Sequence, residues 1–118
     1  MSRLVVATKY TRVQAMDERG QGNGNHVYLI DCPMKGIPMP EPQTIHFQNG
    51  PIKEKGVNGI TNEDLLAVVI DRLAGFQAGK FRCEQNGIAL QKVQEALFWL
   101  ANRTALREAR NVEGTNIV

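Results

Sequence analysis

The sequence has little of what metal centres, disulfide frameworks or membrane spans require. Its two cysteines, Cys32 and Cys83, are far apart and outside any CxxC spacing, so we expect neither a zinc site nor a disulfide framework. No apolar run approaches the roughly 20 residues of a membrane helix, and the first ten residues lack the apolar stretch of a secretory signal. We therefore expect reduced thiols, no metal, no cofactor and no membrane contact.

The sequence also lacks a large net charge, because 14 basic and 12 acidic residues leave a net charge of +2. Generic binding to duplex DNA needs many clustered phosphate contacts, so DNA is not an expected partner. The sequence contains no HExxH, GxSxG or Walker loop. Neither cysteine has a neighbouring histidine that would activate a thiol nucleophile. The length of 118 residues favours one domain, residues 1–118.

The sequence pattern changes near residue 60, from strand and turn signals before it to helical periodicity after it, and this change predicts an α+β fold. Residues 1–46 are rich in β-branched residues and turn formers, which indicates a small N-terminal antiparallel β-sheet. The expected strands are residues 4–13, 26–32 and 43–47. Loops are expected at 20–25, where Gly and Asn alternate, and at 33–42 and 49–59, where proline or glycine interrupts the chain.

Residues 47–118 predict an antiparallel hairpin of two helices. Thr61 is the expected N-cap of the first helix, which ends at Gly79, and the second helix runs from about residue 82 to 111. Apolar residues recur at helical spacing in both: Leu65, Leu66, Val69, Leu73 and Phe76, then Leu90, Val93, Leu97 and Leu100. Because so short a chain often gains burial by association, we expect oligomerisation through the helices, with Phe98 and Trp99 in the core or at a subunit interface.

Arg103, Arg107 and Arg110 form the most informative cluster. Their spacing of four and three residues places them on one face of the second helix. Adjacent guanidinium groups repel one another, and a phosphate-bearing partner relieves that cost through bidentate hydrogen bonds. The alternative is a solvated charged face balanced by Glu108 and Glu113.

Phe76 and Asn86 lie near the connection between the helices. Phe76 could stack on a purine or close the hairpin core, and Asn86 could be a pocket residue or a helix-start asparagine. Asn86 and Arg103 are 17 positions apart on one helix, which corresponds to about 25 Å. If both hold one small ligand, the site must be built from two chains, as in an antiparallel dimer of hairpins.

Two histidines offer an enzymatic alternative. His26 and His46 each lie on an expected strand, as in two-histidine phosphodiesterases, where an HxT or HxS pair does acid and base work. The third positions here are Tyr28 and Gln48, so the motif is not matched. A structural or regulatory oligomer without a small ligand is the third hypothesis.

Three runs of the helical half carry a compound motif: FQNGPIKEKGVNGIT, IDRLAGFQAGKFRCEQNGIAL and ALFWLANRTALREARNVEGT. Together, over residues 47–115, they resemble the helical hairpin domain of two phage signal sponges, the Thoeris anti-defence type-one family and the anti-CBASS type-two family. Residues 3–32 resemble the β-rich part of the Thoeris sponge.

The resemblance implies a non-enzymatic phage anti-defence protein in the cytoplasm of the infected bacterium. It implies binding of glycocyclic ADP-ribose, and of CBASS cyclic di- and trinucleotides, without cleavage. It also implies homodimers or homohexamers with ligands between subunits. By position it assigns Phe76, Asn86, Arg103 and Arg107 to the ADP-ribose signal, and Arg110 and Thr115 to a separate cyclic trinucleotide site. Where the anti-CBASS sponge stacks a cyclic dinucleotide on an aromatic ring, this chain has Val57-Asn58-Gly59.

Overall fold

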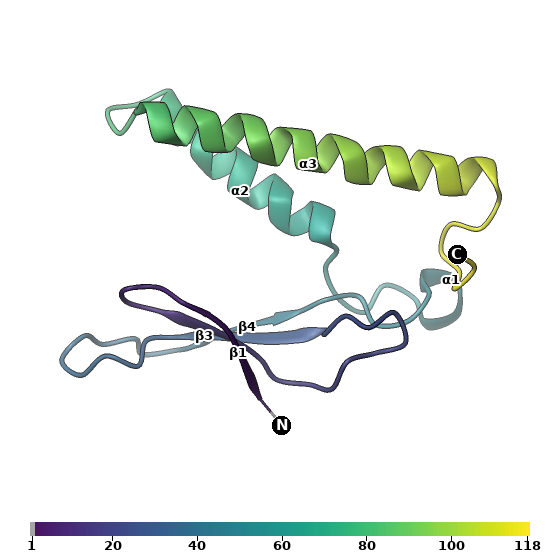
Figure 1. Ribbon diagram of the computed structural model, residues 1–118, viewed down its shortest axis with the longest axis horizontal. Helices are drawn as coiled ribbons and strands as arrows, with labels where there is room; N and C mark the ends of the chain where they lie inside the picture. The colour runs from purple at the N-terminus through teal and green to yellow at the C-terminus, as the bar shows by residue number, and fades with distance from the viewer. Residues whose placement is uncertain (1) are drawn as a thin grey trace. The chain divides into compact units, whose positions relative to one another are not determined.

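The computed structural model describes residues 2–118 and confirms the α+β fold (Figure 1). The chain forms two compact units. One unit is the N-terminal sheet with residues up to Gly50 and residues 55–60, and the other holds residues 51–54 and 61–118. The elements, in chain order, are β1 (Arg3–Ala7), β2 (Arg12–Ala15), β3 (Val27–Asp31), β4 (Gln43–His46), α1 (Ile52–Lys55), α2 (Asn62–Gln77) and α3 (Glu84–Ala109).

The sheet is an antiparallel meander with the strand order β1-β2-β3-β4. The single strand expected over residues 4–13 was wrong, because the chain reverses between Ala7 and Arg12. Thr8 and Thr11 close this turn with a backbone hydrogen bond of 2.8 Å and a contact of 2.9 Å between their hydroxyls. Threonine is β-branched and therefore favours strands. The run of β-branched residues thus predicted a strand at a place where threonine hydroxyls stabilise a turn.

Two carboxylates of the N-terminal unit, those of Asp31 and Asp17, accept hydrogen bonds from groups in the same unit. The Asp31 carboxylate accepts two hydrogen bonds from Arg12, of 2.8 and 3.0 Å, and these bonds lower the pKa of Asp31 and raise that of Arg12. Desolvation pushes the pKa of Asp17 upward, but the backbone N–H groups of His26 and Val27 donate to its carboxylate, and the net effect is a lowered pKa.

The segment expected as a loop at 49–59 contains one short helix, α1. Pro51 precedes it, and the backbone N–H of Glu54 donates to the carbonyl of Pro51. Proline fixes a helical φ and lacks the N–H that a first turn leaves unpaired, so it starts a helix without cost. The expectation of continuous loop was wrong for these four residues.

Helix α2 begins where the sequence predicted. Thr61 is the N-cap: its hydroxyl accepts from the backbone N–H of Asp64, and the Asp64 carboxylate accepts from the backbone N–H of Thr61, which completes a capping box. The helix ends at Gln77, two residues before the predicted stop at Gly79. Helix α3 starts after the N-cap Cys83, whose sulfur accepts from the backbone N–H of Asn86.

Helices α2 and α3 form the predicted hairpin (Figure 1), and the residues of the predicted seam are among the less exposed ones of α3. These four residues are half-buried: Leu90, Val93, Leu97 and Leu100. Other apolar residues of α3 are exposed, since Phe98, Trp99 and Leu106 are each 61% exposed. Of the two alternatives for Phe98 and Trp99, a place in the core of the single chain was therefore wrong. No residue of α2 or α3 is fully buried, and none of the helices in residues 2–118 has the length and hydrophobicity to cross a bilayer.

Candidate functional site

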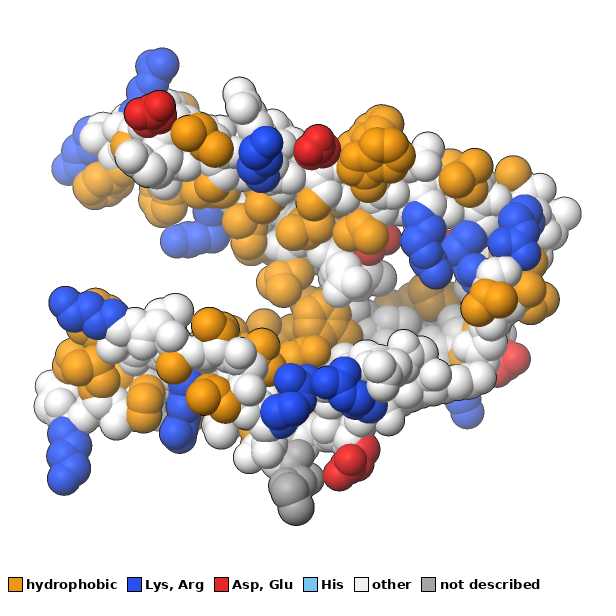
Figure 2. All heavy atoms as spheres, in the orientation of Figure 1, with side chains coloured by type: hydrophobic (Ala, Val, Ile, Leu, Met, Phe, Trp, Pro, Cys, Tyr) orange, Lys and Arg blue, Asp and Glu red, His pale blue; other side chains and the backbone are white. Residues whose placement is uncertain are grey.

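Helix α3 is longer than its partner, with 26 residues against 16 in α2. The excess of about ten residues corresponds to about 15 Å of helix without a neighbour in the hairpin. Arg103, Arg107 and Arg110 lie in or directly after this overhang. Figure 2 shows Lys and Arg side chains gathered at this end of α3. Three arginines thus lie at the end of the hairpin opposite the connection between the helices.

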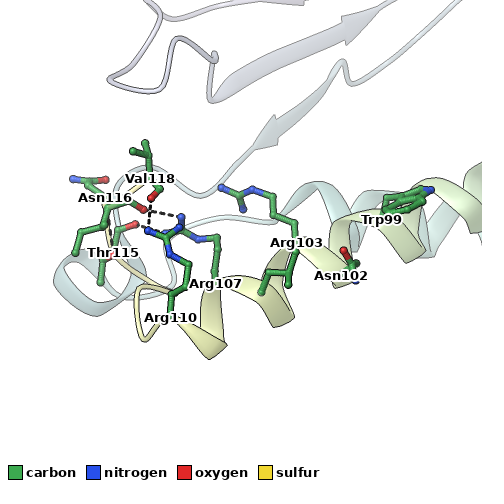
Figure 3. Close-up of a pocket in the computed structure, with 10 residues that line it drawn as sticks. Trp99, Asn102, Arg103, Arg107, Arg110, Thr115, Asn116 and Val118 are labelled. Atoms are coloured by element: carbon green, nitrogen blue, oxygen red, sulfur yellow. Dashed lines mark hydrogen bonds between the residues drawn. The ribbon is translucent and has the colours of Figure 1, made fainter.

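The overhang and the segment after it enclose an open hollow of about 710 Å³ (Figure 3). This volume is in the range of small-molecule sites. One wall belongs to α3 and its C-cap, and the other to residues 115–118. The residues lining the hollow are Trp99, Asn102, Arg103, Leu106, Arg107, Arg110, Thr115, Asn116, Ile117 and Val118. An exposed indole, two amides and three guanidinium groups therefore line one space.

The arginines of this hollow differ in their partners. Arg103 has no hydrogen bond or ion pair with any residue in 2–118, whereas Arg110 donates one hydrogen bond of 2.7 Å to the main-chain oxygen of Val118. Of the three arginines, Arg107 is the one that contacts a carboxylate within residues 2–118, namely that of Glu113, at 3.1 Å. Three positive side chains with one paired carboxylate leave an uncompensated positive potential, which attracts a multiply charged anion.

Arg107 is the least exposed of the three, with 11% of its side chain accessible. Besides Glu113, its guanidinium donates to the carbonyl oxygens of Ile117 at 2.7 Å, Val112 at 2.9 Å and Thr115 at 3.2 Å. The hydroxyl of Thr115 donates to the Val112 carbonyl and accepts from the backbone N–H of Ile117. Both side chains, to which the family resemblance assigns ligand binding, are here also bonded to the chain itself.

Phe76 lies at the other end of the hairpin, in the last turn of α2. Its ring is 36% exposed and meets the ring of Phe81 edge to face, with 6.2 Å between centroids. The Arg72 guanidinium lies over the Phe76 ring at 5.3 Å from its centroid. A base that stacks on Phe76 must use the uncovered ring face or displace Arg72, and the cation beside the ring favours an anionic nucleotide.

Asn86 sits in the first turn of α3, close to a shallower hollow of about 570 Å³ lined by residues from both helices, among them Gln77, Cys83 and Gly87. The Gln77 amide closes the connection between the helices, because it donates to the Cys83 carbonyl at 2.9 Å and accepts from the Cys83 N–H at 3.0 Å. A Cβ on Gly87 would lie 3.1 Å from the Gln77 amide nitrogen, so glycine at this position leaves room for the Gln77 side chain.

The six predicted site residues thus fall into two groups. Phe76 and Asn86 lie at the connection end, and Arg103, Arg107, Arg110 and Thr115 surround the hollow at the opposite end. The helical rise still puts about 25 Å between Asn86 and Arg103. One chain does not bring all six together around a ligand of nucleotide size.

Val57-Asn58-Gly59, at the position where the anti-CBASS sponge is expected to carry a stacking aromatic, form a tight loop. Asn58 accepts from the Asn49 N–H at 2.8 Å and donates to the Asn49 carbonyl at 2.7 Å. A Cβ on Gly59 would lie 2.5 Å from the backbone carbon of Phe47. No residue larger than glycine fits at position 59 without moving the backbone.

The two histidines of the enzymatic alternative lie on opposite faces of the sheet. Val27 pairs with His46 in the β3–β4 register, and the Phe47 N–H donates to the His26 carbonyl. Directly opposed residues share a face, and consecutive residues alternate, so His26 and His46 point away from each other. This arrangement does not assemble a two-histidine acid–base pair.

Sequence reasoning missed the segment that closes the hollow. Asn111, at a φ of 59°, ends α3 in a Schellman motif, in which the Val112 N–H donates to the Arg107 carbonyl and the Asn111 N–H to that of Glu108. Val112 is then 8% exposed. The signal was present, since an asparagine followed by an apolar residue and then Gly114 is typical of such a helix end.

Comparison with known sequences identifies the domain family of this chain. The Acb2/Tad1 hairpin domain matches residues 39–105, more than half of the chain. The chain belongs to the Acb2/Tad1 hairpin-domain family. Phe76, Asn86 and Arg103 lie inside the matched region, whereas Arg107, Arg110 and Thr115 lie beyond it.

A relative from Bacillus phage SBSphiJ7, Thoeris anti-defense 1, is 55% identical over 73 residues, which are 62% of this chain and 51% of that protein. The chain therefore spans about half the length of the relative. The resemblance to the sponge families is confirmed at the level of the family and its hairpin domain.

Proposed function

We propose that this protein binds and sequesters cyclic nucleotide immune signals, glycocyclic ADP-ribose first among them, without cleaving them. The observation that carries the proposal is the hollow at the end of α3, where three arginines converge with one paired carboxylate. Phosphate groups satisfy such a cluster bidentately. The name of the relative, Thoeris anti-defense 1, supports a role against Thoeris immunity in the cytoplasm of an infected bacterium.

The complete site is formed by two chains. Arg103 and Arg107 of one chain hold the phosphates, and Phe76 and Asn86 of a second chain hold the base, because these pairs occupy opposite ends of one hairpin. Arg110 and Thr115 form the second site, for a cyclic trinucleotide. Association also covers the exposed apolar face of α3, including Phe98 and Trp99.

The dimer geometry follows from the pairing. If two α3 helices run antiparallel and Asn86 of one lies opposite Arg103 of the other, the twofold axis passes near residues 94 and 95. A Glu95→Cys variant, made in a background with Cys32 and Cys83 replaced by serine, should therefore form a disulfide-linked dimer on oxidation. Lys92→Cys, one turn away from the axis, is the matched control and should cross-link much less.

Sequestration acts by mass action: tight binding lowers the free signal that the host effector senses. The decisive test mixes excess protein with glycocyclic ADP-ribose and measures the free signal by filtration and mass spectrometry. We expect the signal to disappear from the filtrate and to return with unchanged mass after heat denaturation. A steady conversion of the signal into an opened product would overturn the proposal in favour of a phosphodiesterase, and no loss of any cyclic nucleotide would favour a ligand-free oligomer.

A further inference from the structure

The connection between α2 and α3, at one end of the hairpin (Figure 1), is fastened by a side chain that the proposed site does not use. Gln77 is the last residue of α2, and Cys83 is the N-cap of α3. The Gln77 Nε2 donates to the Cys83 carbonyl at 2.9 Å, and the Gln77 Oε1 accepts from the Cys83 N–H at 3.0 Å. One amide therefore bonds both polar groups of the backbone at the point where α3 begins.

The N-cap that Gln77 holds is a weak one. The Cys83 sulfur accepts from the Asn86 N–H at 3.4 Å, and sulfur is a poorer acceptor than the side-chain oxygens that usually cap a helix. The Cys83 carbonyl also accepts from the Gly87 N–H at 3.2 Å. Because Gln77 fixes Cys83, and Cys83 bonds to Asn86 and Gly87, the Gln77 amide sets where the first turn of α3 lies relative to the last turn of α2.

Burial at the connection follows the same three residues. Between residues 74 and 89, every residue is exposed except Gln77, Asn86 and Gly87, which are half-buried. A side chain at position 87 would crowd the Gln77 amide, because a Cβ there would lie 3.1 Å from its nitrogen. Glycine is unfavourable inside a helix, and the close approach of Gln77 gives a physical reason for its presence at this position. The first turn of α3 thus rests on the Gln77 amide.

We infer that Gln77 is a positioning residue for the signal, which holds Asn86 in a fixed place relative to Phe76 so that both side chains meet one base. Phe76 directly precedes Gln77, and the Asn86 N–H is bonded to the cysteine that Gln77 holds. Ordering these two side chains before the ligand arrives lowers the entropy that binding must remove. The inference rests on the proposed function, in which Phe76 and Asn86 take the base. Gln77 acts through these neighbours and does not contact the ligand.

The first test replaces the amide on the full chain. Gln77→Met keeps the length of the side chain and removes both hydrogen bonds. We expect exchange of the Cys83 amide hydrogen to accelerate about tenfold and the affinity for glycocyclic ADP-ribose to fall about three- to tenfold, the scale of a lost neutral hydrogen bond. Gln91→Met is the matched control, because Gln91 lines the same hollow and has no hydrogen bond within residues 2–118. It should leave both measurements within about twofold of the wild type.

A double-mutant cycle separates positioning from a general loss of structure. In an Asn86→Ala background, Gln77→Met should weaken binding by less than about twofold, because the side chain that it positions is already absent. In an Arg103→Ala background it should keep its full effect, since Arg103 meets the phosphates and not the base.

Gln77→Glu gives a reversible version of the same test. The carboxylate still accepts from the Cys83 N–H but has no donor for the Cys83 carbonyl, whereas the protonated acid offers one O–H and one carbonyl oxygen, as the amide does. Arg82 and Glu84 line the same hollow and are unchanged in this variant. Its affinity relative to the wild type should therefore recover as the pH falls through the glutamate pKa of about 4.3.

Several results would overturn the inference. Faster exchange at Cys83 with unchanged affinity would show that the fastened connection does not position the site. An undiminished loss in the Asn86→Ala background would show that Gln77 does not act through Asn86. If the wild-type chain binds no cyclic nucleotide, the proposed function itself fails, whereas wild-type binding with an unaffected Gln77→Met variant removes only the role of Gln77. Helix content by circular dichroism checks that each variant is folded.

Discussion

In the sheet, Arg12 donates two parallel hydrogen bonds to the Asp31 carboxylate, whereas Arg103 on α3 has no bonded partner in residues 2–118. The first arrangement joins neighbouring strands and neutralises its own charge. The second leaves a guanidinium facing an open hollow. Because an unpaired guanidinium gains from an anion and a paired one does not, the comparison separates arginines that stabilise this fold from arginines available to a ligand.

Arg107 lies between these extremes and explains why spacing alone could not assign it. It shares a helix face with Arg103, yet its partners are Glu113 and three carbonyls of its own chain. Side-chain periodicity reports which residues lie together, but not which acceptors a chain end brings to them. The same cluster therefore contains one arginine bonded to its own chain and one without a bonded partner in residues 2–118.

The largest effect should come from replacing the unpaired arginine. Arg103→Ala should weaken binding of glycocyclic ADP-ribose about 10- to 100-fold, because it removes charge-assisted hydrogen bonds worth about 1.5–3 kcal/mol. Isothermal titration calorimetry measures the change. Arg12→Ala is the opposing control: it should lower the stability of the sheet and leave affinity within about twofold. Equal losses of affinity in both variants would erase the distinction between the two arginines.

The connection end of the hairpin supplies the next largest effect. Phe76→Ala should weaken the same ligand about tenfold, since base–aromatic stacking is worth about 1–3 kcal/mol. Phe81→Leu removes the ring that meets Phe76 edge to face but leaves Phe76 itself, so its effect should be smaller. Mixing Phe76→Ala chains with Arg103→Ala chains should restore some sites, because a heterodimer combines one intact end from each chain. Failure of this complementation would argue against a site shared between subunits.

Much of the fold could be predicted from local rules, and the capping box shows why. Thr61 and Asp64 interact within four residues, so the pattern of neighbours is sufficient to place the start of α2. The arrangement of residues 112–118 could not be predicted in this way, because Arg107 contacts Ile117 ten positions away and only after Asn111 has turned the chain. The turn at Thr8–Thr11 was missed for another reason, namely that its residues favour strands by type.

The sequence predicted which arginines lie close together, but not the partners that each of them has in the structure. The arginine spacing and the separation of Asn86 from Arg103 are properties of one regular helix, and both hold in the structure. The partners of Thr115 and Arg107 depend on irregular backbone after the helix, which has no period to be read. Gln77, whose amide closes the connection, was missed because such a bond leaves no sequence pattern.

A smaller effect should follow from loosening the start of α2, which belongs to neither ligand group. Thr61→Ala should lower the free energy of unfolding by about 1 kcal/mol, because the N-cap bond to the Asp64 N–H is lost. Chemical denaturation followed by circular dichroism measures this change. Thr61→Ser keeps the hydroxyl and should remain close to the wild type. Ligand affinity per folded protein should stay constant, so a parallel loss of affinity would link the start of α2 to the site.

The smallest effect should be the response of the sheet to acid, which tests the paired arginine directly. The hydrogen bonds from Arg12 lower the pKa of Asp31 below its ordinary value of 3.8, so the carboxylate stabilises the fold while it is ionised. This stabilisation is fully present above pH 3.8 and is lost as the pH falls through the lowered pKa. The protection factors of the β3 amides, which correct for the intrinsic pH dependence of exchange, should therefore fall below that pH in the wild type, and Asp31→Asn should show a flatter pH dependence. Asp17, whose pKa is also lowered, contributes a second step in the same direction, so the double variant Asp17→Asn/Asp31→Asn should be the flattest. A wild-type acid response that persists unchanged in the double variant would show that the sheet owes its acid sensitivity to other carboxylates.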